Sequence, residues 1–198
     1  MRHFNNIWSF VPIDEQKWRE GIQPKQNLAI EIGAGAGYHP VRFAQGNPET
    51  FLVAIERTQI KAEKMMGRVS YHPHLKNVCA LHADAVEWIC QNVQENEVSA
   101  YFMLYPNPYP KEKQANKRFM NMPFMHKLLQ TLKTDGEITL ATNMLFYYEE
   151  AKKVFCDTWG LKIKEDRVLD KLFTPRTHFE KKYLARGEAC YNVVFYKS

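Results

Sequence analysis

The chain has 198 residues, of which 45% are apolar and 25% are charged. This length and composition predict one globular domain over residues 1–198 and exclude a disordered protein. No stretch reaches the ~18 apolar residues of a membrane span, and no signal peptide is recognisable, so we expect a cytoplasmic protein without membrane contact. The net charge of +5 is compatible with nucleic-acid binding but does not require it.

Apolar runs alternate with helical patterns along the chain. This order predicts βαβ units and an α/β fold with a mostly parallel sheet and helices on both faces. The predicted strands are 27–32, 51–55, 77–83, 98–105, 137–141, 161–168 and 191–196. The predicted helices are 40–45, 58–70, one that opens at 84–88, 119–132 and about 145–158.

A glycine loop follows the first predicted strand, with the sequence EIGAGAG at 31–37. Gly33, Gly35 and Gly37 allow a sharp turn and a close approach of the backbone to a ligand. Dinucleotide-binding proteins have similar loops, so the glycines alone specify no cofactor. Two features favour S-adenosylmethionine: Glu31 can bind the ammonium of a methionine moiety, and the loop lacks the later glycine that lets a pyrophosphate approach.

Two more carboxylates follow the next predicted strands. Glu56, next to Arg57, lies about 20 residues beyond the glycines, where a carboxylate accepts hydrogen bonds from ribose hydroxyls. Asp84, next to Ala85, is placed to meet the edge of an adenine. Three acidic residues at successive strand ends, beside a glycine loop, predict an S-adenosylmethionine site.

The segment after the fourth predicted strand is the most distinctive part of the chain, with YPNPYPK at 105–111. Its three prolines end the strand and exclude a helix. A basic run starts at its last residue, and a second one lies near the C-terminus; the two consist of Lys111, Lys113, Lys117 and Arg118, and of Arg176, Lys181, Lys182 and Arg186. Solvated basic faces are the alternative, but the aromatic and proline neighbours favour a binding surface.

The cysteines lie far apart and form no C-x-x-C pair: they are Cys79, Cys90, Cys156 and Cys190. This spacing disfavours disulfides and zinc sites, and we expect buried, reduced thiols. The histidines of HPH at 72–74 have no further ligands nearby and predict a loop. The sequence therefore predicts no metal site.

Three motifs together resemble the tRNA (guanine-N7-)-methyltransferases of the bacterial TrmB type. The segment at 105–111 is similar to F-P-D-P-W-P-K, LKTDGEITLATN at 132–143 to L-K-P-G-G-x-L-x-L-A-T-D, and THFE at 177–180 to T-K-F-E. The likeness covers nearly the whole chain from about Leu28. It implies a Rossmann-like class I methyltransferase fold, whose seven-stranded, mostly parallel sheet has an antiparallel last strand.

The resemblance implies transfer of a methyl group from S-adenosylmethionine to a guanine N7 of tRNA. With the patterns above, the expected cofactor contacts are Glu31, Gly33, Gly35, Gly37, Glu56, Arg57, Asp84, Ala85 and Asn107. The expected acceptor contacts are Tyr109, Lys111, Lys113, Lys117, Arg118, Asn143, Thr177, Phe179 and Glu180. We expect catalytic roles for Asn107, Lys111 and Asn143, with tRNA as the partner and the protein as a monomer or homodimer.

The expected chemistry requires no general base, because guanine N7 already carries a lone pair. Catalysis can come from in-line positioning and from the electrostatic environment. The methylated base is cationic, so nearby carboxylates favour the transition state. Glu180 could accept hydrogen bonds from guanine N1–H and N2–H, which would select guanine over adenine.

Four positions depart from the family pattern. Asn107 and Asn143 replace aspartates, Tyr109 replaces a tryptophan, and Tyr183 replaces a glycine. An asparagine can orient a base but cannot neutralise a cation. Alternatives therefore stay open: a slow N7-methyltransferase, a methyltransferase of another acceptor (an exocyclic amine or a small molecule), or an RNA-binding paralogue with impaired catalysis.

Overall fold

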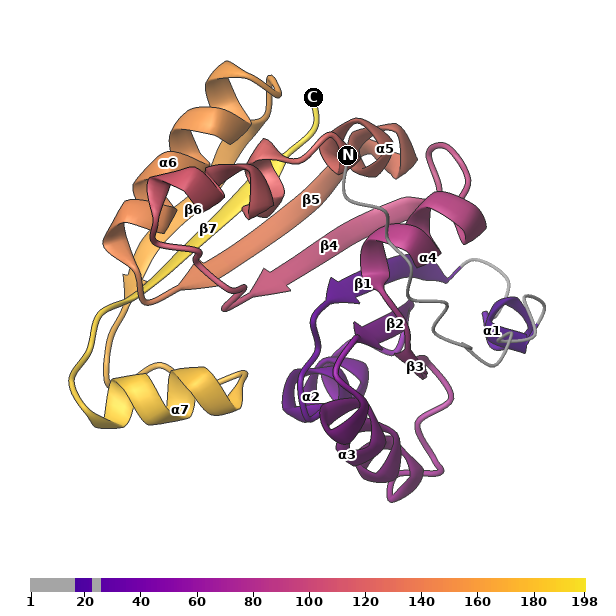
Figure 1. Ribbon diagram of the computed structural model, residues 1–198. Helices are drawn as coiled ribbons and strands as arrows, with labels where there is room; N and C mark the ends of the chain where they lie inside the picture. Colours follow the sequence, from indigo (N-terminus) through magenta and orange to yellow (C-terminus); the bar gives the residue numbers. More distant parts are fainter. Residues whose placement is uncertain (1–16, 23–25) are drawn as a thin grey trace.

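The computed structural model describes residues 17–22 and 26–198. Its centre is a seven-stranded sheet with the order β3-β2-β1-β4-β5-β7-β6 (Figure 1). The strands are β1 (Asn27–Ile32), β2 (Thr50–Glu56), β3 (Val78–His82), β4 (Val98–Leu104), β5 (Leu132–Thr142), β6 (Lys162–Leu169) and β7 (Cys190–Tyr196). β7 runs antiparallel to its neighbours β5 and β6, whereas the pairs from β3 to β5 are parallel. The predicted sheet with an antiparallel last strand is confirmed.

Helices cover both faces of this sheet (Figure 1). α2 (Tyr38–Gly46) and α3 (Gln59–Ser70) pack on one face, and α4 (Ala85–Asn92), α5 (Phe124–Thr131) and α6 (Leu145–Asp157) pack on the other. The short α1 (Lys17–Glu20) and α7 (His178–Ala185) complete the α-helices of the described residues. Because both faces are covered, the inner strands contain continuous apolar runs, as in β2, where Leu52 to Ile55 are fully buried.

The largest core lies between the sheet and α4, α5 and α6. The Trp18 and Trp88 rings meet edge to face there, with centroids 5.0 Å apart. A buried hydrogen bond of 2.7 Å joins the Tyr101 and Thr131 hydroxyls, so this core contains a satisfied polar pair. The core fixes β4 and β5, whose C-terminal ends carry the distinctive proline segment and Asn143.

The predicted helix over 119–132 was wrong in its first half. Two short 3₁₀ helices, η1 (Glu112–Lys117) and η2 (Phe119–Asn121), precede α5. Pro123 separates η2 from α5, because proline disfavours helical backbone in the residue before it and has no N–H. β5 begins directly after α5, five residues before the predicted strand 137–141; within this extension Asp135 has a φ of 61° and its N–H donates to the Lys197 carbonyl.

The cysteine prediction holds only in part. All four cysteines are free, but only Cys190 is buried, and Cys90 is exposed. Burial raises the pKa of the Cys79 thiol to about 11, so this group stays protonated at neutral pH. The HPH segment at 72–74 forms a loop, as predicted.

Residues 17–22 and 26–198 contain no group of three or more His, Cys, Asp or Glu side chains that could hold a metal ion. No helix in the same residues has the length and apolar character that a membrane crossing needs.

Candidate active site

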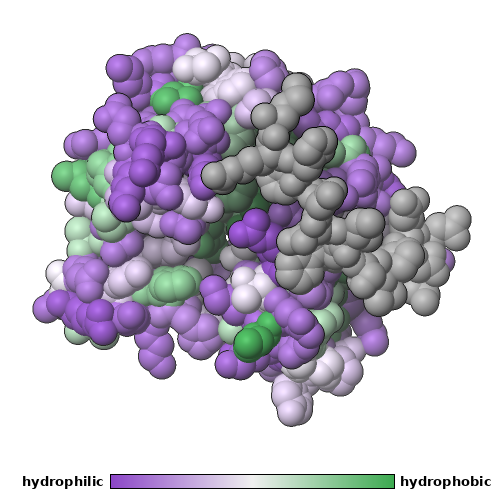
Figure 2. All heavy atoms as spheres, viewed as in Figure 1, coloured by the Kyte–Doolittle hydropathy of each residue, from purple (hydrophilic) through white to green (hydrophobic). Residues whose placement is uncertain are grey.

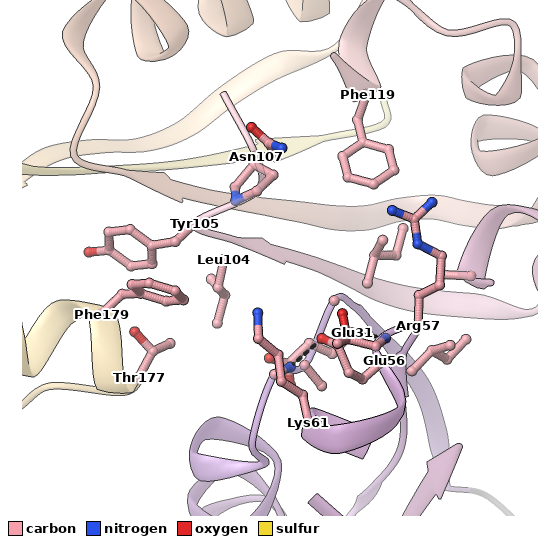
Figure 3. A pocket seen from close by; sticks show the side chains of 18 of the residues that line it. Glu31, Glu56, Arg57, Lys61, Leu104, Tyr105, Asn107, Phe119, Thr177 and Phe179 are labelled. Carbon is pink, nitrogen blue, oxygen red and sulfur yellow. Dashed lines mark hydrogen bonds between the residues drawn. The ribbon is translucent and has the colours of Figure 1, made fainter. Parts of the chain in front are cut away.

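A cavity of about 890 Å³ opens where β1, β2, β4 and β5 end (Figure 3). Figure 2 shows polar side chains over most of the described surface of this face, with apolar side chains visible in a central recess. The predicted cofactor residues that line the cavity are Glu31, Gly33, Gly35, Glu56, Arg57, Asp84, Ala85 and Asn107. The predicted acceptor residues that line it are Tyr109, Lys117, Asn143, Thr177 and Phe179. The fold therefore brings most residues of both sets to one cavity.

The glycine loop turns tightly between β1 and α2. Gly33, Gly35 and Gly37 have φ values of 81°, 60° and 78°, in the left-handed region that favours glycine. A Cβ on Gly33 or Gly35 would meet nothing within 4 Å, so both face open space at the cavity. Gly37 does not line the cavity: a Cβ there would lie 3.0 Å from the Met65 Cα. Gly37 thus allows α2 to pack closely against α3, and its predicted cofactor contact gains no support from this position.

Alanine substitutions in this loop should show which glycine is needed for packing. We expect Gly37→Ala to lower the free energy of unfolding by about 2 kcal/mol, because it combines a left-handed φ with a clash against Met65. Gly33→Ala has the same φ problem but free space, so its loss should be about 1 kcal/mol. Urea unfolding of both variants measures the difference, and equal losses would contradict the packing role of Gly37.

Three carboxylates stand at successive strand ends. Glu31, at 2% exposed, accepts a hydrogen bond from the His39 ring. Glu56 accepts the N–H of Gly35 at 2.9 Å and the N–H of Thr58 at 2.7 Å, which fixes its carboxylate against the glycine loop. Each ionised carboxylate has about four acceptor positions, so Glu56 retains capacity for two ribose hydroxyls.

Asp84 has two local contacts. It caps α4, because its Oδ1 accepts the N–H of Val86 at 3.0 Å and of Glu87 at 3.3 Å. Its Oδ2 lies 3.6 Å from the Arg57 guanidinium. Asp84 and Ala85 nevertheless line the cavity. The ammonium, ribose and adenine of S-adenosylmethionine thus have matching groups in chain order along one sheet edge, and the residues present fit this cofactor.

The proline segment forms the wall opposite the glycine loop. Tyr105 and Tyr109 have φ values of 56° and 44°, and the Asn107 Oδ1 accepts the N–H of Tyr109 at 3.3 Å. Arg118 donates from Nε and from a terminal nitrogen to the Tyr109 carbonyl and pairs with Glu150. This arrangement holds the segment in a compact turn over the cavity.

The basic run after the proline segment divides into two groups. Arg118 is only 7% exposed, lies outside the cavity lining and pairs with Glu150, so its predicted acceptor contact gains no support from this geometry. Lys111 and Lys113 are exposed outside the cavity, whereas Lys117 lines it, with its Nζ 5.9 Å from the centre of the Tyr109 ring. Within this basic run, the lysines and not Arg118 are therefore the cations available to a bound molecule.

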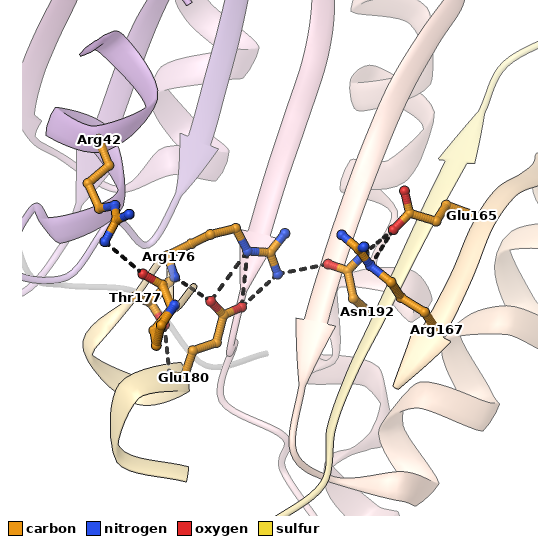
Figure 4. Close-up of polar contacts among 8 residues, drawn as sticks. Arg42, Glu165, Arg167, Arg176, Thr177, Glu180 and Asn192 are labelled. Atoms are coloured by element: carbon orange, nitrogen blue, oxygen red, sulfur yellow. Dashed lines mark hydrogen bonds and ion pairs between the residues drawn. The ribbon is translucent and has the colours of Figure 1, made fainter. Parts of the chain in front are cut away.

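α7 is anchored by a buried polar network (Figure 4). Thr177 caps the helix by accepting the N–H of Glu180 at 3.0 Å. Glu180 is 0% exposed, and both its oxygens accept hydrogen bonds from Arg176, which also donates to the Asn192 side chain at 2.8 Å. The carboxylate of Glu180 is thus enclosed between α7 and β7. In this arrangement it is not free to make the predicted contact with guanine.

An aromatic cluster of Tyr105, Phe179 and Tyr183 lines the cavity beside Thr177. The three pairs of ring centroids lie 5.7–6.0 Å apart. Burial is the main cause that raises the pKa of the Tyr105 hydroxyl, so this ring stays neutral. Phe179 is 42% exposed and leaves a ring face accessible. The sequence predicted only Phe179 as a contact; Tyr183 was noted as a departure from the family.

Tyr38, His39 and His178 are among the cavity residues that the sequence analysis did not predict as contacts. The Tyr38 and His178 rings lie 4.9 Å apart and connect α7 to α2. Burial lowers the pKa of His178, and the charges of Arg68 and Lys181 lower it further, so its imidazole is neutral at pH 7. A signal for Tyr38 and His39 was present, because both follow the glycine loop directly.

Comparisons with known proteins identify the family of the chain. A family model described as "Putative methyltransferase" matches residues 25–193. The tRNA (guanine-N(7)-)-methyltransferase of Aquifex aeolicus is 32% identical over 178 residues, with 86% of this chain and 57% of the relative covered. The enzyme of that name from Neisseria gonorrhoeae (strain NCCP11945) is 27% identical over 191 residues, with 94% and 79% covered. The chain thus spans little more than half the length of the Aquifex relative.

Solved structures share the fold. A structure of an antibiotic related methyltransferase matches with a TM-score of 0.71 and 18% identity, covering 94% of this chain and 96% of that one. The 16S rRNA methyltransferase KamB matches with a TM-score of 0.64 and 16% identity, covering 98% and 97%. The family match decides the identity beyond the fold: the chain belongs to this methyltransferase family, as a divergent relative of the bacterial tRNA (guanine-N7-)-methyltransferases.

Proposed function

We propose that this protein transfers the methyl group of S-adenosylmethionine to N7 of a guanine in tRNA. One observation carries the proposal: the glycine loop with its three carboxylates and the proline segment with α7 line the same cavity. The relatives named as tRNA (guanine-N(7)-)-methyltransferases support the choice of acceptor. We further propose that the whole chain works as one domain in the cytoplasm, as a monomer or homodimer.

Each residue at the cofactor end has a role in binding and orientation. S-adenosylmethionine supplies an electrophilic methyl group on a sulfonium. Glu31 would bind its ammonium, Glu56 its ribose hydroxyls, and Asp84 with Ala85 would border its adenine. These contacts fix the cofactor, so that a guanine N7 held about 3–3.5 Å from the methyl carbon can attack in line.

The acceptor end combines aromatic surface with polar groups. A base must leave its stack to enter such a cavity, and aromatic rings can replace the lost stacking. The exposed face of Phe179, supported by Tyr105 and Tyr183, is the surface we assign to this role. Asn107 and Asn143, both on the cavity wall, would orient the base edge. No proton has to be removed, because N7 attacks with its lone pair.

The exposed lysines near the proline segment should bind the tRNA backbone. We expect Lys113→Gln to weaken binding similarly for different tRNAs and to lower the salt dependence, log K against log [salt], by about one unit. Filter binding at several salt concentrations measures this slope. Lys153→Gln, which removes an exposed charge on α6 outside the cavity, is the matched control. An unchanged slope for Lys113→Gln would show that tRNA binds elsewhere.

The decisive experiment is methyl transfer from labelled S-adenosylmethionine to tRNA that lacks 7-methylguanosine, followed by nucleoside analysis. The proposal predicts labelled 7-methylguanosine. A different labelled nucleoside would overturn the N7 assignment and favour another acceptor atom, such as an exocyclic amine. No label, with cofactor binding intact, would mean that tRNA is not methylated by this protein.

A further inference from the structure

A buried histidine lies in the first turn of α2, directly after the glycine loop. His39 is the second residue of α2, is 6% exposed, and lines the same cavity as Glu31. It belongs to none of the motifs described above. A buried polar ring is expected to have a hydrogen-bond partner.

The partner of His39 is Glu31, whose Oε2 lies 2.8 Å from the ring Nδ1. An ionised carboxylate can only accept hydrogen bonds, so Nδ1 carries the proton and donates. In the part of the chain that the structure describes, this is the one hydrogen bond to the Glu31 carboxylate. Since Glu31 is 2% exposed, water cannot take over this role without rearrangement.

Two aromatic rings fix the orientation of His39. The ring centroids of Phe102 and Phe43 lie 5.0 Å and 5.7 Å from the centroid of His39, and they are 5.0 Å from each other. Phe102 on β4 pairs in register with Glu31 on β1, so the sheet sets the spacing between carboxylate and imidazole. The donor is thus held in place before any ligand arrives.

We propose that His39 is a positioning residue for the cofactor: it holds Oε2 of Glu31 so that the other carboxylate oxygen faces the ammonium of the methionine moiety. The inference rests on S-adenosylmethionine as cofactor and is independent of the acceptor. Without the imidazole donor, the carboxylate can rotate about its last torsion angle and loses a charge-assisted hydrogen bond. The effect is confined to ligands that carry the ammonium.

The test compares a ligand that carries the ammonium with one that lacks it. S-adenosylhomocysteine carries the amino-acid ammonium, whereas 5′-methylthioadenosine lacks the amino-acid part. We expect His39→Leu to weaken S-adenosylhomocysteine binding about tenfold, as for the loss of one hydrogen bond to a charged group, and to leave 5′-methylthioadenosine binding unchanged. His39→Asn should restore most of the affinity, because its amide can donate from near the position of Nδ1. Isothermal calorimetry measures the affinity of the parent protein and of both variants for each ligand.

Several outcomes would overturn the proposal. An equal loss for both ligands would show that His39 only shapes the cavity, and no loss for either would show that Glu31 is held without it. A well-folded His39→Asn variant that binds as weakly as His39→Leu would assign the effect to packing. If His39→Leu does not fold, His39→Phe keeps a ring against Phe102 and gives the same comparison. Because no acceptor is present, failure to methylate tRNA leaves the result interpretable.

Discussion

Replacing Glu180 by alanine is expected to lower the free energy of unfolding by about 3 kcal/mol, because it leaves a partly buried cation without its partner. Glu180 is fully buried, and Arg176 is bound to both of its oxygens and to Asn192. Loss of this network should release α7 from β7. The aromatic cluster and Thr177 would then lose their place at the cavity, so methyl transfer to tRNA should fall as well. Urea unfolding and the transfer assay measure the two effects.

Glu63→Ala is the matched control for this prediction. Glu63 also accepts a hydrogen bond from the residue four positions earlier, Gln59, but on the exposed face of α3. Its removal should change the stability by less than about 0.5 kcal/mol. If Glu180→Ala keeps the stability of the parent protein but loses acceptor binding, then Glu180 contacts the base directly, as the family resemblance implied. This outcome would require α7 to change its arrangement when tRNA binds.

Restoring a carboxylate at position 107 is expected to raise kcat/KM for tRNA about 100-fold, the effect of one well-placed electrostatic group. Asn107 lines the cavity, where the base becomes cationic on methylation. Its Oδ1 already accepts the N–H of Tyr109, so an aspartate in Asn107→Asp can form the same turn. Steady-state rates with tRNA lacking 7-methylguanosine measure the change. An unchanged rate would mean that the family aspartate has no electrostatic role in this cavity.

The second asparagine should respond differently. The Asn143 amide donates to the Glu188 carboxylate at 3.4 Å, so Asn143→Asp places two like charges side by side. We therefore expect a smaller gain from Asn143→Asp than from Asn107→Asp. Adding Glu188→Gln removes the repulsion and should recover the difference. Equal gains from both single variants would contradict the contact between Asn143 and Glu188.

The cofactor half of the site was predictable because its signals are local. The strand, glycines and Glu31 form one continuous segment, and Glu56 and Asp84 each follow an apolar strand directly. Parallel strands bring their ends to one edge, so the clustering follows from the order of elements alone. The order of elements also predicted the mostly parallel sheet, whereas its antiparallel last strand was predicted from the family resemblance.

The acceptor half was less predictable because charge alone does not reveal a partner. Arg118 belongs to a basic run, yet it pairs with Glu150 on α6 and becomes buried. Glu180 belongs to a shared motif, yet it is enclosed by Arg176 and Asn192. Gly37 looks like its two neighbouring glycines and differs only in its contact with Met65 of α3. Each of these outcomes depends on a residue that is distant in the sequence or in another element.

The edge strand β6 has a consequence for how copies of the protein can associate. Among residues 17–22 and 26–198 it pairs with β7 alone, so its other side is the kind of edge to which another chain can add a strand. Most of its residues are exposed, and its charged side chains include Lys164, Asp166 and Arg167. Adding a strand there would strip water from these charges, which opposes aggregation through the sheet. We therefore expect copies of the protein not to associate through this edge.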